Sequence, residues 1–274
     1  MKDPFQRIGK HPLGWALLAL VWSAMVSAEE PPATDTTALV NKAAMQRMLS
    51  QRIAKAYFYL GNRIRISESR RQLAASRKAF RDNLTFLQQH VDDPQAKEVL
   101  AFVAFAFEEY DELTARPYDP EEAALVLDLS ETLLETSNEL VKRLEARTGH
   151  EENRLIDLAG SQRMLAQRIA KYYIAYQAGF RDSHSVHQLR KAVEAFEGNL
   201  ALLTQSPENS PATAQLLQKI ANQWRIIKRF FLTIEKGGIP AMVMVAADRI
   251  TELSDQVTKL YLQRRTPRRP SRIR

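Results

Sequence analysis

The chain has 274 residues, enough for one large or two medium domains, and its 45% hydrophobic and 26% charged residues are typical of a globular protein. Because Cys is absent, disulfides, thiolate metal sites and a cysteine nucleophile are excluded. The net charge of +7 comes from the two ends, since outside residues 1–28 and 264–274 there are 30 basic against 31 acidic residues, a balance that argues against a nucleic-acid partner.

The N-terminus has the pattern of a secretory signal peptide. Basic residues precede an apolar run, residues 13–28, which ends in small residues before Glu29. The run is short for a spanning helix, which needs about 20 apolar residues. We therefore expect residues 1–28 to be a signal peptide cleaved after Ala28, with a retained anchor as the alternative. Cleavage predicts a periplasmic protein that begins with a linker, residues 29–37.

Self-comparison reveals an internal duplication. The segment QRMLSQRIAK at residues 46–55 recurs as QRMLAQRIAK at residues 162–171, with nine of ten positions identical at an offset of 116. Apolar positions further along each copy match at the same offset, such as Phe80 with Phe196. The sequence thus predicts two repeats, residues 38–148 and residues 151–264.

Turn and capping residues divide each repeat into four helices. They are, in chain order, Gly61-Asn62, Asp93-Pro94 and Asp119-Pro120, then Gly179, Ser210-Pro211 and Gly237-Gly238 before Pro240. Short joints between helices force antiparallel neighbours. The predicted fold class is therefore all-α, with two tandem up-and-down four-helix bundles related by internal duplication. Because four helices return the chain to its starting end, the first helices of the two repeats can lie parallel.

The repeated segment resembles the P-box of bacterial nitrate/nitrite sensor proteins and the N-terminal sensory domain of type IV pilus methyl-accepting chemotaxis transducers. In that family the first helix presents an arginine to nitrate at a two-fold interface between bundles. By position, the resemblance assigns this role to Arg47 and Arg163. The family's lysine falls on Lys42 in the first repeat, whereas Leu158 replaces it in the second. Transmembrane and signalling modules of such receptors have no counterpart in this sequence.

The residues around these arginines favour an anion independently. At 100° per residue, Ala43, Ser50 and Ala54 lie within about 60° of Arg47, and alanines occupy the equivalent places around Arg163. Small residues allow another helix to approach closely, so the guanidinium would be buried and need a negative partner. Because residues 40–61 contain no Asp or Glu and the second copy has only Asp157 nearby, we predict one oxyanion per chain, held between both arginines.

Other polar residues of the segment have competing interpretations. Arg52 and Arg168 match the family's second arginine, but they lie about 140° around the helix and favour structural pairing with acids of later helices. Acids on later helices, such as Glu108, Glu109 or Glu139, are also an alternative for the first arginines. The segment's glutamines either orient a ligand or face solvent; they are Gln46, Gln51, Gln162 and Gln167.

No motif indicates an enzyme, a metal or a cofactor. His184 and His187 have metal-like spacing, but a solvated pair at a helix start is the more common arrangement. We therefore predict a periplasmic small-anion sensor, nitrate or nitrite being the first candidates, that signals through a membrane partner. The alternative is a structural adaptor of an envelope or type IV pilus-linked system. The arginine-rich end, residues 265–274, is predicted to be a disordered tail that either contacts an anionic surface or has no role.

Overall fold

The computed structural model describes residues 36–146 and 154–265, and this part of the chain is almost entirely α-helical, as the sequence predicts. The predicted signal peptide lies outside the described residues, as do most of the predicted linker and the arginine-rich tail. The elements are α1 (Thr36–Gly61), α2 (Ile66–His90), α3 (Pro94–Ala115), α4 (Ala123–Glu145), α5 (Arg154–Gln177), α6 (Ser183–Gln205), α7 (Pro211–Leu232), a short 3-10 helix η2 (Ile234–Lys236) and α8 (Pro240–Arg265).

Side-chain caps explain several of these boundaries. The Asp93 carboxylate accepts a hydrogen bond of 2.8 Å from Ala96 N at the start of α3, and Ser210 Oγ accepts one of 3.1 Å from Thr213 N at the start of α7. Both caps precede a proline in the first turn. The predicted cap at Asp119 is wrong, because its carboxylate accepts from Glu121 N at 2.9 Å and closes a local turn. Helix α4 begins only at Ala123, without a side-chain cap.

Each repeat forms a helical bundle around its first helix. In the first repeat, α1 packs against α2 and α4, and α3 packs against α4; in the second, α5 packs against α6 and α8, and α7 against α8. Equivalent aromatic pairs fill both cores. The rings of Phe80 and Phe107 lie 4.1 Å apart, and those of Phe196 and Trp224 lie 4.4 Å apart. The duplication is therefore visible in packing as well as in sequence.

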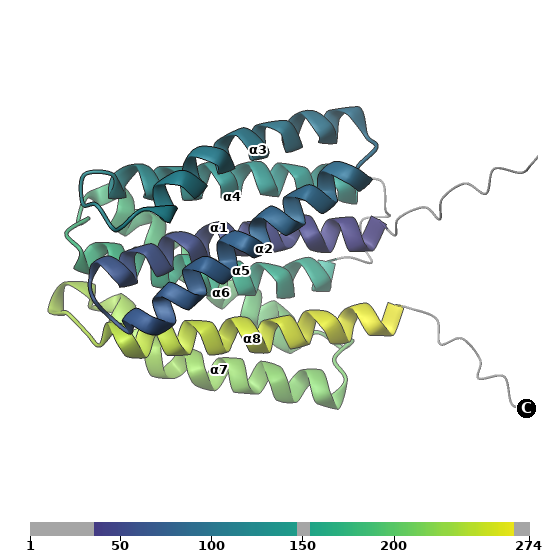
Figure 1. The fold of residues 1–274 in the computed structure, drawn as a ribbon. Coiled ribbons are helices and arrows are strands. Elements are labelled where there is room, and N and C mark those ends of the chain that lie inside the picture. Colours follow the sequence, from purple (N-terminus) through teal and green to yellow (C-terminus); the bar gives the residue numbers. More distant parts are fainter. Residues whose placement is uncertain (1–35, 147–153, 266–274) are drawn as a thin grey trace, which may run out of the picture. The chain divides into compact units, whose positions relative to one another are not determined.

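The two bundles meet through their first helices. Helices α1 and α5 pack against each other and run in the same direction, with residues 36 and 154 at the same end (Figure 1). The small residues predicted to allow this contact are buried, including Ala43, Ala54, Ala159 and Ala170. Since α1 and α5 each contact their own bundle and the other repeat, most of their faces are buried. Their polar side chains must therefore find partners inside the protein.

Among the described helices, none combines the length and the apolar character that a membrane span requires.

Candidate functional site

Arg47 and Arg163 converge at the α1–α5 contact. Their side chains are only 7% and 2% exposed. A methyl group placed on Gly160 of α5 would lie 3.4 Å from Arg163 Nη2 and 3.7 Å from Arg47 Nη2, so both guanidinium groups reach the same point. Gly160 is equivalent to Ala44 in the first repeat. The predicted meeting of the two arginines is thus present in the structure, and a glycine lies where they meet.

Each arginine is paired with a carboxylate in this structure. Arg47 Nη2 lies 2.8 Å from Asp157 Oδ1 of α5, and Arg163 Nη1 lies 2.7 Å from Asp255 Oδ1 of α8. The sequence indicates little compensation near the two arginines, and Asp255 is a partner that the sequence analysis does not predict. The cluster therefore contains two positive and two negative charges. None of the alternative acids proposed from sequence pairs with either arginine among the described residues.

Each arginine also donates to an asparagine, and each asparagine lies at the position where the other repeat has an aspartate. Arg47 Nη1 donates to Asn138 Oδ1 at 3.3 Å, and Arg163 Nη2 donates to Asn41 Oδ1 at 3.5 Å. Asn41 occupies the position equivalent to Asp157, and Asn138 the position equivalent to Asp255. Each guanidinium therefore faces one aspartate from the second repeat and one asparagine from the first. The cluster is neutral in total, but its negative charges all lie on the second repeat, so it departs from two-fold symmetry.

The acids are more accessible than the arginines. The side chains of Asp157 and Asp255 are 38% and 30% exposed. Burial lowers the pKa of the Arg163 guanidinium, and the nearby charge of Arg47 acts in the same direction, while Asp255 opposes both. The Nε atoms of both arginines are buried without a hydrogen-bond partner among the described residues. The site consequently has buried donors that are not satisfied and acids that reach water.

Two further ionic contacts join one repeat to the other. Lys55 of α1 pairs with Asp248 of α8, and Lys171 of α5 pairs with Glu131 of α4. Both lysine side chains are completely buried, and burial lowers the pKa of each to about 8. Burial alone would raise the pKa of Glu131, but the charges of Lys171 and Arg168 outweigh it and lower that pKa to about 2. These residues connect each first helix to the last helix of the other repeat.

The remaining predicted residues lie around this cluster. Arg168 donates from Nε to Glu131 at 3.2 Å and from Nη2 to Gln188 at 2.9 Å, so it makes a structural ion pair, but with an acid of the preceding helix α4 instead of an acid of a later helix. The positive charge of Arg52 helps to lower the pKa of the Asp248 carboxylate. Lys42 Nζ donates to Asn83 Oδ1 of α2 at 2.9 Å, which directs it toward α2.

The glutamines are fully buried, so the alternative that they face solvent is wrong. Gln46 and Gln162 each donate at 3.2 Å to a main-chain oxygen of α2 or α6 in their own repeat. Gln51 donates to Ser130 O at 2.8 Å, and Gln167 donates to Thr251 Oγ1 at 2.7 Å. Ser50 Oγ donates to Arg47 O at 3.0 Å. The glutamine contacts connect the first helices to their own bundles, whereas the Ser50 bond stays within α1.

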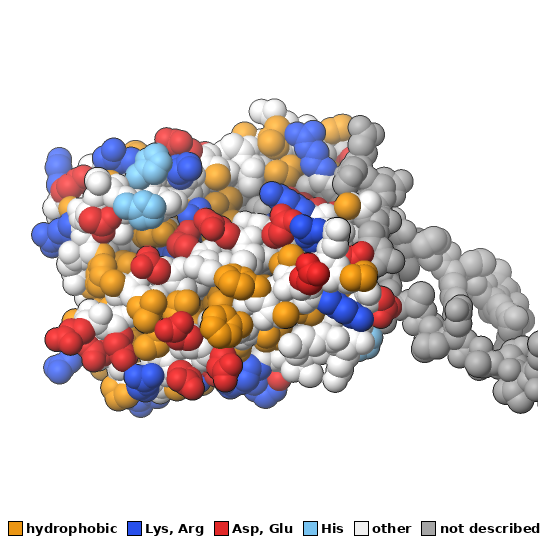
Figure 2. Space-filling view, turned by 90° about the horizontal axis from the view of Figure 1, so that it is seen from above, with side chains coloured by type: hydrophobic (Ala, Val, Ile, Leu, Met, Phe, Trp, Pro, Cys, Tyr) orange, Lys and Arg blue, Asp and Glu red, His pale blue; other side chains and the backbone are white. Residues whose placement is uncertain are grey.

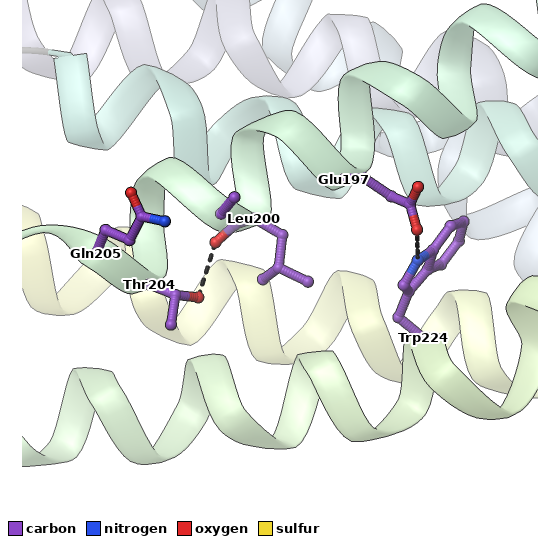
Figure 3. A pocket seen from close by; sticks show the side chains of 6 residues that line it. Glu197, Leu200, Thr204, Gln205 and Trp224 are labelled. Carbon is purple, nitrogen blue, oxygen red and sulfur yellow. Dashed lines mark hydrogen bonds between the residues drawn. The ribbon is translucent and has the colours of Figure 1, made fainter.

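A surface hollow between α6 and α7 has a different character (Figure 3). Trp224 Nε1 donates to Glu197 Oε1 at 2.9 Å, and Thr204 Oγ1 donates to Leu200 O at 2.7 Å. Glu197 also pairs with Lys228. These polar groups bind one another, and an anion would face the Glu197 carboxylate, so the hollow is a poor anion site.

Comparison with known proteins places the repeats in a family. The model described as type IV pili methyl-accepting chemotaxis transducer N-term matches residues 33–139 and again residues 148–250. The chain belongs to this family. No curated protein and no solved structure matches it. Each matched segment contains one copy of the repeated box, so the chain carries two chemotaxis-transducer N-terminal domains in tandem, and such domains are periplasmic-type sensory modules rather than catalytic ones.

Within these two transducer domains, sequence reasoning missed the ionic contacts between repeats. Lys55 and Lys171 are the last residues of the repeated box, and Glu131 and Asp248 align at an offset of 117. An acid retained at equivalent positions, together with a lysine retained in the box, was the signal that could have indicated these pairs. The two aspartates paired with the arginines could have been found in the same way, by asking where an acid in one repeat aligns with an asparagine in the other.

Proposed function

We propose that the chain is a periplasmic sensory module that binds one small planar oxyanion, with nitrate or nitrite as the first candidates, between Arg47 and Arg163. The observation that carries this proposal is the convergence of two buried guanidinium groups, from equivalent helices, on the space beside Gly160. A guanidinium keeps its charge and offers a planar pair of donors, which matches a planar oxyanion. The resemblance to nitrate/nitrite sensors points to the same residues.

In this proposal, Asp157 and Asp255 act as internal competitors of the ligand. They neutralise the arginines in the empty state, and their partial exposure allows each carboxylate to rotate into water when an anion takes its place. Asp157 lies in the first turn of α5, and Asp255 lies in the second half of α8. When a ligand replaces the carboxylates, the ion pairs that connect α5 and α8 to the two arginines are therefore lost. Such differential contacts are what a ligand needs to shift a conformational equilibrium.

A structural adaptor is the second candidate, and one specific observation favours it. The arginine cluster already contains equal numbers of positive and negative groups. A buried cluster that is neutral and hydrogen bonded can serve packing alone. In that case the two repeats would hold a fixed arrangement for a membrane partner, and no anion would alter it.

Thermal unfolding and calorimetry with nitrate, nitrite, sulfate, chloride and small carboxylates distinguish these candidates. A binder gains stability of RT ln(1 + [L]/Kd), about 2.7 kcal/mol at a ligand concentration of 100 Kd. Asp157→Asn and Asp255→Asn should each increase affinity for the preferred anion, because a competing carboxylate is lost. Glu252→Gln, an exposed acid elsewhere on α8, is the matched control. Equal, small effects of all anions, with no gain in either aspartate variant, would favour the adaptor.

Export and signalling complete the proposal. Residues 1–28 are proposed to be a cleaved signal peptide, and the sensory module is proposed to report anion occupancy to a membrane-bound partner. N-terminal sequencing of the mature protein should begin at Glu29. Recovery of intact Met1 in a membrane fraction would instead establish an anchor. The basic tail, residues 265–274, is proposed to contact an anionic surface, and its deletion should then reduce association with the envelope.

A further inference from the structure

The outer face of α3 is acidic and aromatic. The helix carries five acidic residues and one basic residue; four of the acids are exposed, and the fifth, Asp111, pairs with Arg77 and Arg81 of α2. Phe102 and Phe105 project from it and are 50% and 73% exposed. Glu98, Glu109 and Glu112 continue the same stripe at intervals of three or four residues, and all three are exposed. Figure 2, seen from the side of α3, shows hydrophobic side chains gathered among Asp and Glu. Neighbouring exposed apolar side chains with polar residues around them mark an interaction surface.

The outer face of α7 carries the opposite charge. This helix has four basic residues and no acidic residue; three of the basic residues are exposed, and Lys228 pairs with Glu197 of α6. At the offset of 117 that aligns the two helices, Glu108 corresponds to Arg225 and Glu112 to Arg229, and all four are exposed. Apolar side chains are exposed on α7 as well. Ile226 lies beside Arg225 and Arg229 on the outer face, and Leu232 lies at the end of the helix. The two repeats therefore share a fold but present complementary outer faces.

The two faces do not meet within one molecule. In the part of the chain that the structure describes, α3 packs on α4 and α7 packs on α8. The two helices lie on opposite edges of the helical region in Figure 1. Both faces are thus available to a partner at the same time.

We propose that the α3 face of one chain binds the α7 face of a second copy of this chain. The contact is heterologous, because it joins two different surfaces, and repeating it builds a ring or a row of molecules. Opposite charges select the pairing of α3 with α7 over α3 with α3 or α7 with α7, since like charges facing each other are strongly unfavourable. The phenylalanines of α3 and the apolar residues of α7 supply the area that leaves water. This association is independent of anion binding at the arginine pair.

Sedimentation velocity and light scattering over a concentration series test the proposal. Two variants reverse one face each: Glu108→Lys with Glu112→Lys, and Arg225→Glu with Arg229→Glu. The wild type should associate with rising concentration and less so at high salt, because exposed charges are screened beyond about 10 Å at 0.1 M ionic strength. Each variant alone should have a dissociation constant raised about tenfold or more, because its two faces now carry like charges.

An equimolar mixture of the two variants provides the decisive arm. Each face of one variant is then complementary to a face of the other, so the mixture should associate as the wild type does. Glu194→Lys with Glu252→Lys changes the net charge by the same amount as the α3 variant but lies on α6 and α8, and it should behave as the wild type. A wild type that stays monomeric at sub-millimolar concentration and low salt would overturn the proposal. A mixture that remains monomeric, while both variants keep their helical circular dichroism, would overturn it as well.

Discussion

Glu131 holds two cations from the other repeat, and its replacement by Gln tests how strongly the repeats are joined. The Lys171 side chain is completely buried and meets Glu131 and Ser130, and Arg168 pairs with the same carboxylate. The pKa of Glu131 lies at about 2, below its ordinary value of 4.5. A shift of that size corresponds to about 3 kcal/mol of stability at neutral pH, since one unit is worth about 1.4 kcal/mol. Loss of one partner from a buried ion pair costs a similar amount, about 3–5 kcal/mol.

We therefore expect Glu131→Gln to lower the free energy of unfolding by about 3 kcal/mol in equilibrium urea denaturation. Adding Lys171→Met should recover part of the loss, because the uncompensated buried charge is then removed. Glu135→Gln, an exposed acid one turn further along α4, is the control and should have little effect. The reasoning is refuted if Glu131→Gln unfolds like the wild type, or if Lys171→Met deepens the loss.

Three further predictions concern other parts of the molecule. Gly160→Ala should leave the fold intact and stabilise α5 by up to about 1 kcal/mol, yet weaken anion binding in calorimetry, because its methyl group would lie between Arg47 and Arg163; unchanged affinity would place the ligand elsewhere. Asp93→Ala should lower stability by about 1 kcal/mol in thermal unfolding, because the cap of α3 is lost. As pH falls from about 5 to about 2, the unfolded chain protonates before the folded Glu131 does, so the free energy of unfolding should decrease. This decrease should be smaller in Glu131→Gln, and an identical acid response would contradict the assignment.

The fold was predictable because its signals are local. Gly61, Asp93-Pro94 and Ser210-Pro211 act within a few residues of themselves, and the structure places helix boundaries where these residues predict them. Small residues around the arginines predicted the α1–α5 contact for a similar reason, since the helical repeat alone determines which residues share a face. Asp119 misled the prediction because an aspartate before proline suits a turn as well as a cap.

The electrostatic partners were not predictable in the same way. Asp255 is more than ninety residues from Arg163, and Asp248 is further still from Lys55, so only the packing of one repeat on the other brings them together. A charged residue at a helix surface is usually solvated, and sequence periodicity does not indicate which residues the second bundle will cover. Alignment of the two repeats shows which acids and lysines occupy equivalent positions, but it indicates which of them pair only once the contact between α1 and α5 is known.

Isothermal titration with nitrate tests the central claim most directly, using the wild type and the Ala and Lys variants of Arg47 and Arg163. The account predicts one anion per chain, loss of most affinity in either alanine variant, and weaker binding in either lysine variant, which keeps the charge but loses the planar pair of donors. Two independent sites per chain, or full affinity in both alanine variants, would contradict it.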